Sequence, residues 1–383
     1  MTKDMRLREI ILNTFSHKKI EKIAFSPRIY YWYLVNKLFM KYRSNKNSPD
    51  NIPPKYLNKS QLEIYKILNA CPRYCFETLY INLLESKLKP DSDIRIKTLR
   101  GQKKDELIQI FNTPIGNLKQ VSAVGGGLGE HLIEYPIKTI DDLKIMRYIL
   151  ENTEISFSDK NYKKAELLFG DWGVVSTYTL HSPYQKLIIE YMGFSRAILF
   201  LKRYKNQIEE FMSFLEKWDD QMYKSISNSP LKIINFGENI DANLSPPPYF
   251  EKYLFPYYEK RITQLKKSNK FCHIHIDGSL KDLLPYLSQL PFDGYEALTA
   301  QPQGDVSLEE IKHAIGNKVL LDGIPSILFL PEYSNNYLEK YTMKVLELFS
   351  PNLIIGISDE LSPNGGIKKV EMVSKIVEKF SPS

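Results

Sequence analysis

The sequence predicts an α/β protein with the (β/α)8 fold of a TIM barrel, carrying helical and hairpin insertions in its N-terminal part. Five short strand-like runs follow one another after residue 230, and each is followed by a segment whose apolar residues have helical spacing. No long β-free interruption separates these units, and strands that alternate with helices at this spacing form a parallel sheet. A doubly wound sheet is the alternative.

The five βα units make up the C-terminal part, residues 231–383. Their strands are predicted as LKIINF, KFCHIHI, GYEALT, KVLLDG and NLIIGI, at 231–236, 270–276, 294–299, 318–323 and 352–357. Their helices are predicted at 249–267, 280–290, 307–315, 337–349 and 367–380. Ser307 and Glu310 have the spacing of a capping box, which predicts where the third helix begins.

The first 230 residues are less regular and are expected to supply the remaining strands and the insertions. Residues 22–33 predict a first strand that turns at Pro27, and 42–60 have the composition of a loop. A hairpin or small meander is predicted from 94–111 and 117–135. The glycines of GGGLG, 125–129, fit a hairpin turn better than a phosphate loop, because the Lys-Ser/Thr of a P-loop is missing. Helices are predicted at 140–152, 184–203 and 208–226.

Composition excludes several classes of protein. The chain has 383 residues, 43% of them hydrophobic, with a net charge of +7, which suits a soluble globular protein. Its lysines are spread along the chain instead of gathered with aromatic residues, so a nucleic-acid partner is not expected. No apolar window is long enough for a transmembrane helix and no secretory signal is visible, so we expect a cytoplasmic protein without a membrane partner. Three cysteines, Cys71, Cys75 and Cys272, are too few for a disulfide framework.

Acidic residues end each of the five predicted strands, where parallel βα units bind their ligands. Carboxylates at strand ends are often helix caps, but five together with a histidine favour a site. Ligand-binding side chains are therefore predicted among the polar residues of these ends, which are Glu238, Asn239, His275, Asp277, Glu296, Gln301, Asp322, Asp359 and Glu360. Arg28, after the predicted first strand, is a candidate to bind an anionic substrate.

The second strand carries the strongest motif. His273, His275 and Asp277 alternate at period two, which places them on one face of the strand. His275 and Asp277 can ligate zinc or another divalent metal, or can form an acid/base pair in which the carboxylate orients the ring. We interpret His273 as a core histidine.

The chain resembles the uroporphyrinogen decarboxylase superfamily, which includes the decarboxylase of haem synthesis and the cobamide-dependent methyltransferases. The resemblance lies in the opening MRLREIILNTF, in NFGENIDANLSPPPYFEKYLFPYYEKR, and in CHIHIDGSLKDLLPYL, GNKVLLDGIP and LIIGISDELSPNGGIKKVEMV. It implies one barrel domain over residues 1–383, with insertions in 1–230, and allows a homodimer. The branch that it resembles most carries H-x-D-G, E-A-x-T-x-x-P-x-G-D and G-I-S-D-E-x-x-P, here beginning at His275, Glu296 and Gly356.

The chain differs from the superfamily at the positions that bind zinc and at the positions that bind substrate carboxylates. Its thiol-directed methyltransferases hold zinc with His-x-Cys and a later Cys, whereas this chain has His275-x-Asp277 and, at the later position, Asp359. Oxygen ligands favour harder metals or no metal. A metal site would use His275, Asp277, Asp359 and Glu360. The decarboxylases carry an arginine-rich N-terminal motif, whereas here Arg28 stands alone.

Three functions are therefore expected. The first is methyl transfer from a methyl-cobamide, presented by a corrinoid carrier protein, to tetrahydrofolate or a thiol, with His275, Asp277 and Glu296 as catalytic residues. In the second, a lyase acts on a smaller carboxylated substrate that Arg28 anchors, and Glu238, Asn239, Gln301 and Asp322 complete substrate binding in either enzyme. The third is a non-catalytic barrel that binds a corrinoid or metal ligand.

Overall fold

The computed structural model describes residues 6–41, 52–101, 103, 105–124 and 130–382, and divides the chain into two compact units. The large unit comprises the residues up to Leu83, Asp159–Thr179 and the residues from Pro230 onward. The inserted unit comprises Leu84–Ser158 and Leu180–Ser229. None of the described helices is long and apolar enough to cross a membrane.

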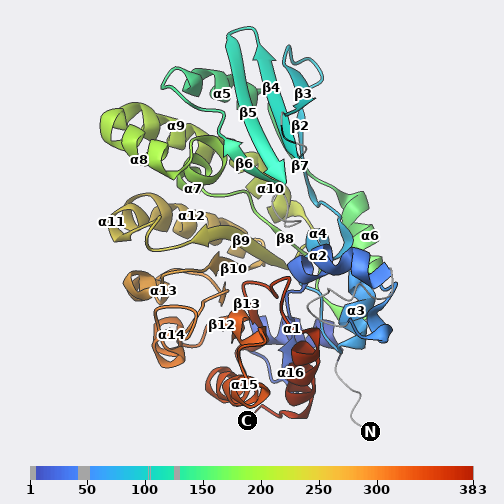
Figure 1. The fold of residues 1–383 in the computed structure, drawn as a ribbon. Helices are drawn as coiled ribbons and strands as arrows, with labels where there is room; N and C mark the ends of the chain where they lie inside the picture. Colours follow the sequence, from blue (N-terminus) through green and yellow to red (C-terminus); the bar gives the residue numbers. More distant parts are fainter. Residues whose placement is uncertain (1–5, 42–51, 102, 104, 125–129, 383) are drawn as a thin grey trace. The chain divides into compact units, whose positions relative to one another are not determined.

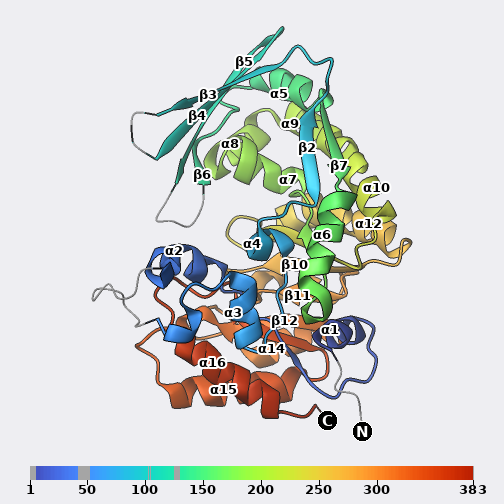
Figure 2. The same ribbon diagram turned by 90° about the vertical axis from the view of Figure 1, so that its right-hand side faces the viewer.

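A seven-stranded parallel sheet forms the centre of the large unit (Figure 1). The five predicted C-terminal strands are confirmed and lie side by side in chain order; Figure 2 shows β10, β11 and β12 in that sequence. The strands, in their order across the sheet, are β1 (Ala24–Phe25), β13 (Leu353–Ser358), β12 (Val319–Pro325), β11 (Gly294–Glu296), β10 (Phe271–Ile276), β9 (Ile233–Ile240) and β8 (Ser176–Tyr178).

Helices follow each of the five strands, as predicted. The third, α14 (Leu308–Ile315), begins with the predicted capping box: the backbone N–H of Glu310 donates to Ser307 Oγ at 3.2 Å, and that of Ser307 donates to Glu310 Oε2 at 2.7 Å. The others are α11 (Pro247–Tyr249), which continues through a π-helical turn into α12 (Phe255–Lys266), and α13 (Leu284–Leu287), α15 (Asn335–Phe349) and α16 (Ile367–Lys379).

The described residues form seven strands of this sheet, and the predicted closed barrel of eight strands is not confirmed. Between the edge strands β1 and β8 lies a non-strand segment, 71–75, which contacts both edges. The N–H of Cys71 donates to the carbonyl of Phe25 in β1 at 2.8 Å, and Ser176 Oγ in β8 donates to the carbonyl of Arg73 at 2.6 Å. Pro72 has no N–H to give to a ladder, which disfavours a regular strand here. Helix α4 (Cys75–Leu79) follows directly.

The N-terminal end of the sheet is closed by α1 (Leu7–Phe15). Ile11 and Phe15 of this helix are buried, and with His273 and Ile354 they line a small internal cavity of about 20 Å³. This end is therefore filled by side chains, and the space for a ligand is at the other end of the strands.

The first strand is confirmed but short. It ends before Pro27, and the aromatic residues that follow form α2 (Tyr30–Lys41) instead of more strand. Trp32 and Asn36 are both buried one turn apart, and Asn36 Nδ2 donates to the Trp32 carbonyl at 2.8 Å. Helical periodicity of burial thus outweighs the β propensity of these aromatic residues. The remaining helices of the large unit are α3 (Gln61–Ile67) and α6 (Asp159–Phe169).

Part of the predicted loop at 42–60 lies outside the described residues. Residues 42–51 are not described, and the rest contains a single 3-10 turn, Pro54–Tyr56. Ser60 then caps α3 by accepting the N–H of Glu63 at 3.3 Å.

The inserted unit confirms the predicted meander and three helical regions. Its antiparallel sheet consists of β3 (Arg95–Arg100), β4 (Glu106–Thr113), β5 (Gly116–Val124) and β6 (Glu130–Glu134), and a second pair joins β2 (Leu84–Leu88) to β7 (Thr153–Phe157). Its helices are α5 (Asp142–Glu151), α7 (Pro183–Lys186), α8 (Phe194–Arg203), α9 (Lys205–Trp218) and α10 (Asp220–Asn228). The turn predicted for 125–129 lies outside the described residues.

Two predicted helices of this unit are each divided in two. The one predicted at 184–203 breaks at Gly193, whose φ is +75° and whose added Cβ would lie 2.8 Å from the Tyr135 ring. The one predicted at 208–226 is divided at Asp219, a fully buried residue that pairs with the buried Lys186. Apolar periodicity continues through both breaks, so it does not reveal them.

Candidate functional site

His275 lies at the C-terminal end of β10, directly beside Glu296 of β11. The two residues are register partners in the parallel sheet, so their side chains point to the same side. His275 Nδ1 lies 3.3 Å from Glu296 Oε2, and a carboxylate only accepts hydrogen bonds, so Nδ1 carries the proton. His275 Nε2 points the other way, 3.6 Å from Asp359 Oδ1. Three of the residues singled out in the sequence therefore meet.

The protonation of His275 reflects opposing influences. Burial lowers its pKa, whereas the hydrogen bond to Glu296 and the charges of Glu296 and Asp359 raise it, and the net pKa lies above the ordinary value. Such a ring is a stronger base than a free histidine, and its Nε2 atom is the one that faces away from the sheet interior.

Arg28 lies at the centre of a group of carboxylates. Its Nη2 donates to Glu77 Oε1 at 2.7 Å, to Glu360 Oε1 at 3.0 Å and to the hydroxyl oxygen of Tyr178 at 3.2 Å. Its Nη1 lies 3.5 Å from Asp359 Oδ1. The residue is only 6% exposed, so the guanidinium is already bound on the inside of the protein.

A second arginine, Arg73, neutralises the carboxylates deeper in the sheet. Its Nη1 donates to Glu296 Oε1 at 2.6 Å, and its Nη2 lies 2.7 Å from Asp322 Oδ1. Glu296 also accepts from the Tyr74 hydroxyl at 2.8 Å and from Asn235 Nδ2 at 2.7 Å. Burial alone would raise the pKa of Glu296, but the nearby arginines and His275 hold it well below its usual range.

These buried groups form one unit, which we call the paired cluster: Arg28, Arg73, Glu77, Glu296, Asp322 and Glu360. Two guanidiniums face four carboxylates in it. Burial raises the pKa of Asp322 to about 6 and raises that of Glu360 above its usual range, which reduces the excess of negative charge.

An open pocket of about 500 Å³ lies at the C-terminal ends of the same strands. We call it the acidic pocket, and its lining residues are Tyr31, Asn239, Asp241, Asn243, Leu244, Asp277 and Asp359. No lysine or arginine is among them. Burial, Asp359 and Asp241 raise the pKa of Asp277, although the charge of His275 lowers it. A half-buried carboxylate with no lysine or arginine beside it in the wall is thus part of the pocket.

Asp241, which directly follows β9 and lines this pocket, contacts the turn after β10. Asp241 Oδ2 accepts the N–H of Ser279 at 2.9 Å. Gly278, directly before Ser279, has a φ of +68°, and a Cβ there would lie 1.9 Å from Asp241 Oδ2. The glycine of the H-x-D-G motif is therefore required by a turn that lets the Asp241 carboxylate approach the backbone.

The other residues singled out in the sequence lie in different places. Asn239 lines the acidic pocket, whereas Glu238 is completely buried and does not line it. Asp322 lies in the interior with Arg73. Glu360 turns inward to Arg28 and accepts the N–H of Tyr31 at 2.9 Å. Their predicted binding roles stay predictions.

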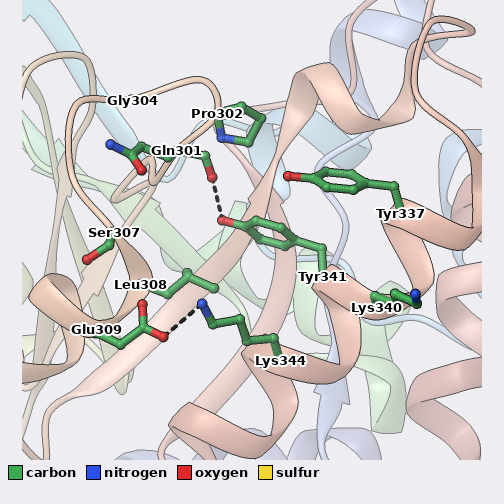
Figure 3. A pocket seen from close by; sticks show the side chains of 10 residues that line it. All are labelled: Gln301, Pro302, Gly304, Ser307, Leu308, Glu309, Tyr337, Lys340, Tyr341 and Lys344. Atoms are coloured by element: carbon green, nitrogen blue, oxygen red, sulfur yellow. Dashed lines mark hydrogen bonds and ion pairs between the residues drawn. The ribbon is translucent and has the colours of Figure 1, made fainter.

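Gln301 lines a separate pocket of about 740 Å³ between α14 and α15, shown in Figure 3. Its carbonyl accepts a hydrogen bond from the Tyr341 hydroxyl at 2.9 Å, and Lys344 of α15 pairs with Glu309 of α14 at 2.7 Å. Gln301 is therefore not gathered with His275.

The residues of the predicted metal site face other side chains of the protein. Among the described residues, no group of three or more His, Cys, Asp or Glu is arranged to hold a metal ion. Glu360 and Asp359 face the guanidinium of Arg28, and Nδ1 of His275 faces Glu296. A metal at His275, Asp277, Asp359 and Glu360 stays a prediction to which this arrangement lends no support.

Several members of the site were not singled out in the sequence. They are Arg73, Tyr74, Glu77, Tyr178, Asn235 and Asp241. Asn235 lies within β9, a strand that was predicted, and Asp241 directly follows it; alternation along that strand could have identified Asn235 as an inward residue. Arg73 and Tyr74 belong to an irregular segment without periodicity. The presence of charged residues within CPRYCFE is the one sequence signal that could have indicated them.

Comparison with known proteins identifies a fold and no family. No protein-family model matches the chain, and no curated protein matches its sequence. The structure is similar to that of a methyltransferase from Methanosarcina mazei, with a TM-score of 0.59 and 12% identity over 98% of this chain and 99% of that one. A B12-independent methionine synthase from Shewanella sp. W3-18-1 matches with a TM-score of 0.44 and 12% identity, over 83% of this chain and 86% of that one. The chain thus shares the fold of a methyltransferase.

Proposed function

We propose that this chain is an enzyme of methyl transfer whose reaction takes place at the acidic pocket, with His275 as the acid/base. The observation that carries the proposal is the orientation of His275: Glu296 holds Nδ1, and Nε2 points toward Asp359 at the pocket wall. The shared fold with a methyltransferase supports the class of reaction. The finer assignment to a cobamide-dependent branch of the uroporphyrinogen decarboxylase superfamily belongs to this proposal.

In this reaction a methyl group passes from a methyl-cobamide to an acceptor, which is a thiol or tetrahydrofolate. The acceptor gains the methyl group and loses a proton to Nε2 of His275, and the cobamide leaves with the electron pair of the broken methyl–cobalt bond. Glu296 keeps the ring oriented and stabilises the imidazolium that forms. No step uses a metal ion, because it is Arg28 that faces Glu360 and Asp359.

The lyase expected as an alternative is less well supported by the geometry. Its substrate carboxylate would need Arg28, but that guanidinium already binds Glu77 and Glu360 and is 6% exposed. A substrate would have to displace two carboxylates to reach it, at a cost of about 1.5–3 kcal/mol for each hydrogen bond to a charged group.

Purified protein titrated with methylcobalamin and each acceptor tests the proposal. We expect loss of the methyl–cobalt absorption with one acceptor, and a decrease of about 10²–10⁴-fold in that rate in His275→Gln. The matched control is His313→Gln, because His313 is exposed on α14 and should leave the rate unchanged. Because the pKa of His275 is raised, the rate should increase with pH through a midpoint above 6.5. The proposal fails if no acceptor removes the methyl group, or if both variants behave alike.

A further inference from the structure

The chemistry of the acidic pocket indicates which kind of substrate it accepts. Its wall contains three carboxylates, two side-chain amides, one phenol ring and one leucine, and no basic side chain. Among the described residues, neither Asp241 nor Asp277 forms an ion pair. Carboxylates that are partly withdrawn from water and lack a counter-charge attract a cation strongly, because the low local dielectric weakens their solvation.

The cations of the protein itself do not fill this role. Among the described arginines and lysines, Arg28 forms an ion pair with a residue of the pocket wall, but its Nη2 donates to Glu77 and Glu360 on the inner side. It approaches the pocket only through Asp359, at 3.5 Å. The three carboxylates therefore present more negative charge to the pocket than the surrounding side chains neutralise.

His275 is a second and independent indication of a ligand here. The residue is 4% exposed, and its Nε2 atom is directed toward the pocket wall. The 3.6 Å between Nε2 and Asp359 Oδ1 is too long for a hydrogen bond, and no described residue supplies another. The lone pair of Nε2 can therefore accept a hydrogen bond from a group that enters the pocket.

The remaining wall favours an organic cation over a metal ion. Tyr31 and Leu244 contribute an aromatic ring and an apolar side chain, and an aromatic face beside carboxylates is a typical binding surface for alkylated cations. Metal ions need three or more ligand groups in a tight geometry, which the described residues do not offer.

We propose that the acidic pocket binds the positively charged group of the substrate, an organic ammonium or sulfonium ion, between Asp277, Asp241 and Asp359 and against the ring of Tyr31. This inference rests on the proposed function for its claim that the bound molecule is a substrate. The binding itself does not depend on methyl transfer and is measured separately.

Calorimetric titration of the full chain with choline and with its neutral isostere 3,3-dimethyl-1-butanol tests the inference. Choline should bind at least about tenfold more tightly than the alcohol, since tenfold corresponds to about 1.4 kcal/mol of charge-dependent attraction. Tetramethylammonium and trimethylsulfonium are titrated in parallel, and the tighter of the two identifies the class of onium group.

Two matched variants locate the binding. Asp277→Asn should weaken choline binding about tenfold or more, whereas Asp282→Asn should leave it unchanged, because Asp282 is an exposed aspartate outside the pocket. Thermal unfolding of both variants verifies that they fold. Equal binding of choline and the alcohol overturns the inference, as does equal binding by the two variants or binding of Mg²⁺ or Zn²⁺ in place of either onium ion. Binding of choline without any methyl transfer would sustain this inference and refute the proposed function.

Discussion

The paired cluster and the acidic pocket occupy neighbouring strand ends but use their carboxylates in opposite ways. In the paired cluster, Glu296 accepts hydrogen bonds from Arg73, Tyr74 and Asn235 and is completely buried. In the acidic pocket, Asp277 is half-buried, no lysine or arginine lines the wall around it, and only the charge of His275 lowers its pKa. The difference teaches that acidic residues at strand ends do not form one site: the first set is neutralised by the protein, and the second is left to be neutralised by a ligand.

Glu296→Gln, which removes a carboxylate of the paired cluster, should reduce the stability of the chain the most. The change removes the charge that pairs with Arg73 and lies 3.9 Å from Arg28, and loss of one partner from a buried ion pair costs about 3–5 kcal/mol. Urea denaturation measures the free energy of unfolding. The control is Glu309→Gln, which removes an exposed pair with Lys344 and should cost less than about 1 kcal/mol. Similar losses in both variants would contradict the neutralising role of the cluster.

Arg28→Lys should have the next largest effect. Lysine keeps the charge but lacks the planar fork with which Arg28 reaches Glu77, Glu360 and Asp359 together. We expect a loss of about 2–3 kcal/mol, equivalent to one or two hydrogen bonds to charged groups. Denaturation of Arg28→Lys beside Lys340→Arg, a surface exchange on α15, provides the comparison. Stability equal to that of the unchanged protein would show that a point charge suffices at this position.

His273, a third buried group at the sheet interior, should make the stability of the chain depend on pH. This ring is completely buried, and burial lowers its pKa to about 3, below the value of about 6.5 in an unfolded chain. Between these values the unfolded chain binds more protons, so stability falls as the pH is lowered from about 6.5 toward 3. By this account the ring contributes a loss of about 2 kcal/mol between pH 7 and pH 5.

The measurement is the free energy of unfolding against pH for His273→Leu, which cannot titrate. Its slope below pH 6.5 should be shallower than that of the unchanged protein. His313→Gln should retain the original slope, since His313 is exposed. Identical slopes in all three proteins would show that His273 is not a buried neutral histidine.

Asp277→Asn should have the smallest effect on stability, and of the opposite sign. Burial, together with repulsion by Asp359 and Asp241, raises the pKa of this carboxyl more than the charge of His275 lowers it, so removal of its charge should stabilise the chain by up to about 1 kcal/mol. Thermal unfolding at pH 7, with Asp282→Asn as the control, measures the change. A marked loss of stability would mean that Asp277 belongs with the neutralised set.

The sequence alone predicted that the strands are parallel, and it predicted the residues that β10 contributes to the site. Period-two alternation identified His273, His275 and Asp277 as one face of a strand, and His275 indeed meets Glu296. The distance between these two depends on the register of neighbouring strands, which no local pattern specifies. Arg28 was noticed, but its binding by Glu77 was not, because 49 residues separate them and helix α4 is only five residues long.

The fold was predicted more fully in its C-terminal part than in its N-terminal part, because local sequence patterns specify the first and long-range contacts specify much of the second. Each C-terminal unit repeats a local pattern of strand and helix, so each could be identified by itself. The contact between the sheet edges instead depends on Cys71, Arg73 and Ser176, which lie in unpatterned segments far apart in the chain. The inserted unit separates them, and tertiary contacts alone bring them together.

The irregular segment 71–75 has a consequence for where side chains can go. Successive residues of a β-strand point to opposite faces, so a strand in this place would direct only one of Arg73 and Tyr74 inward. Here both reach the same carboxylate, Glu296, at 2.6 and 2.8 Å. Because segment 71–75 is not a strand, two consecutive polar side chains can both contact the carboxylate of Glu296. A regular eighth strand in this place would exclude that arrangement.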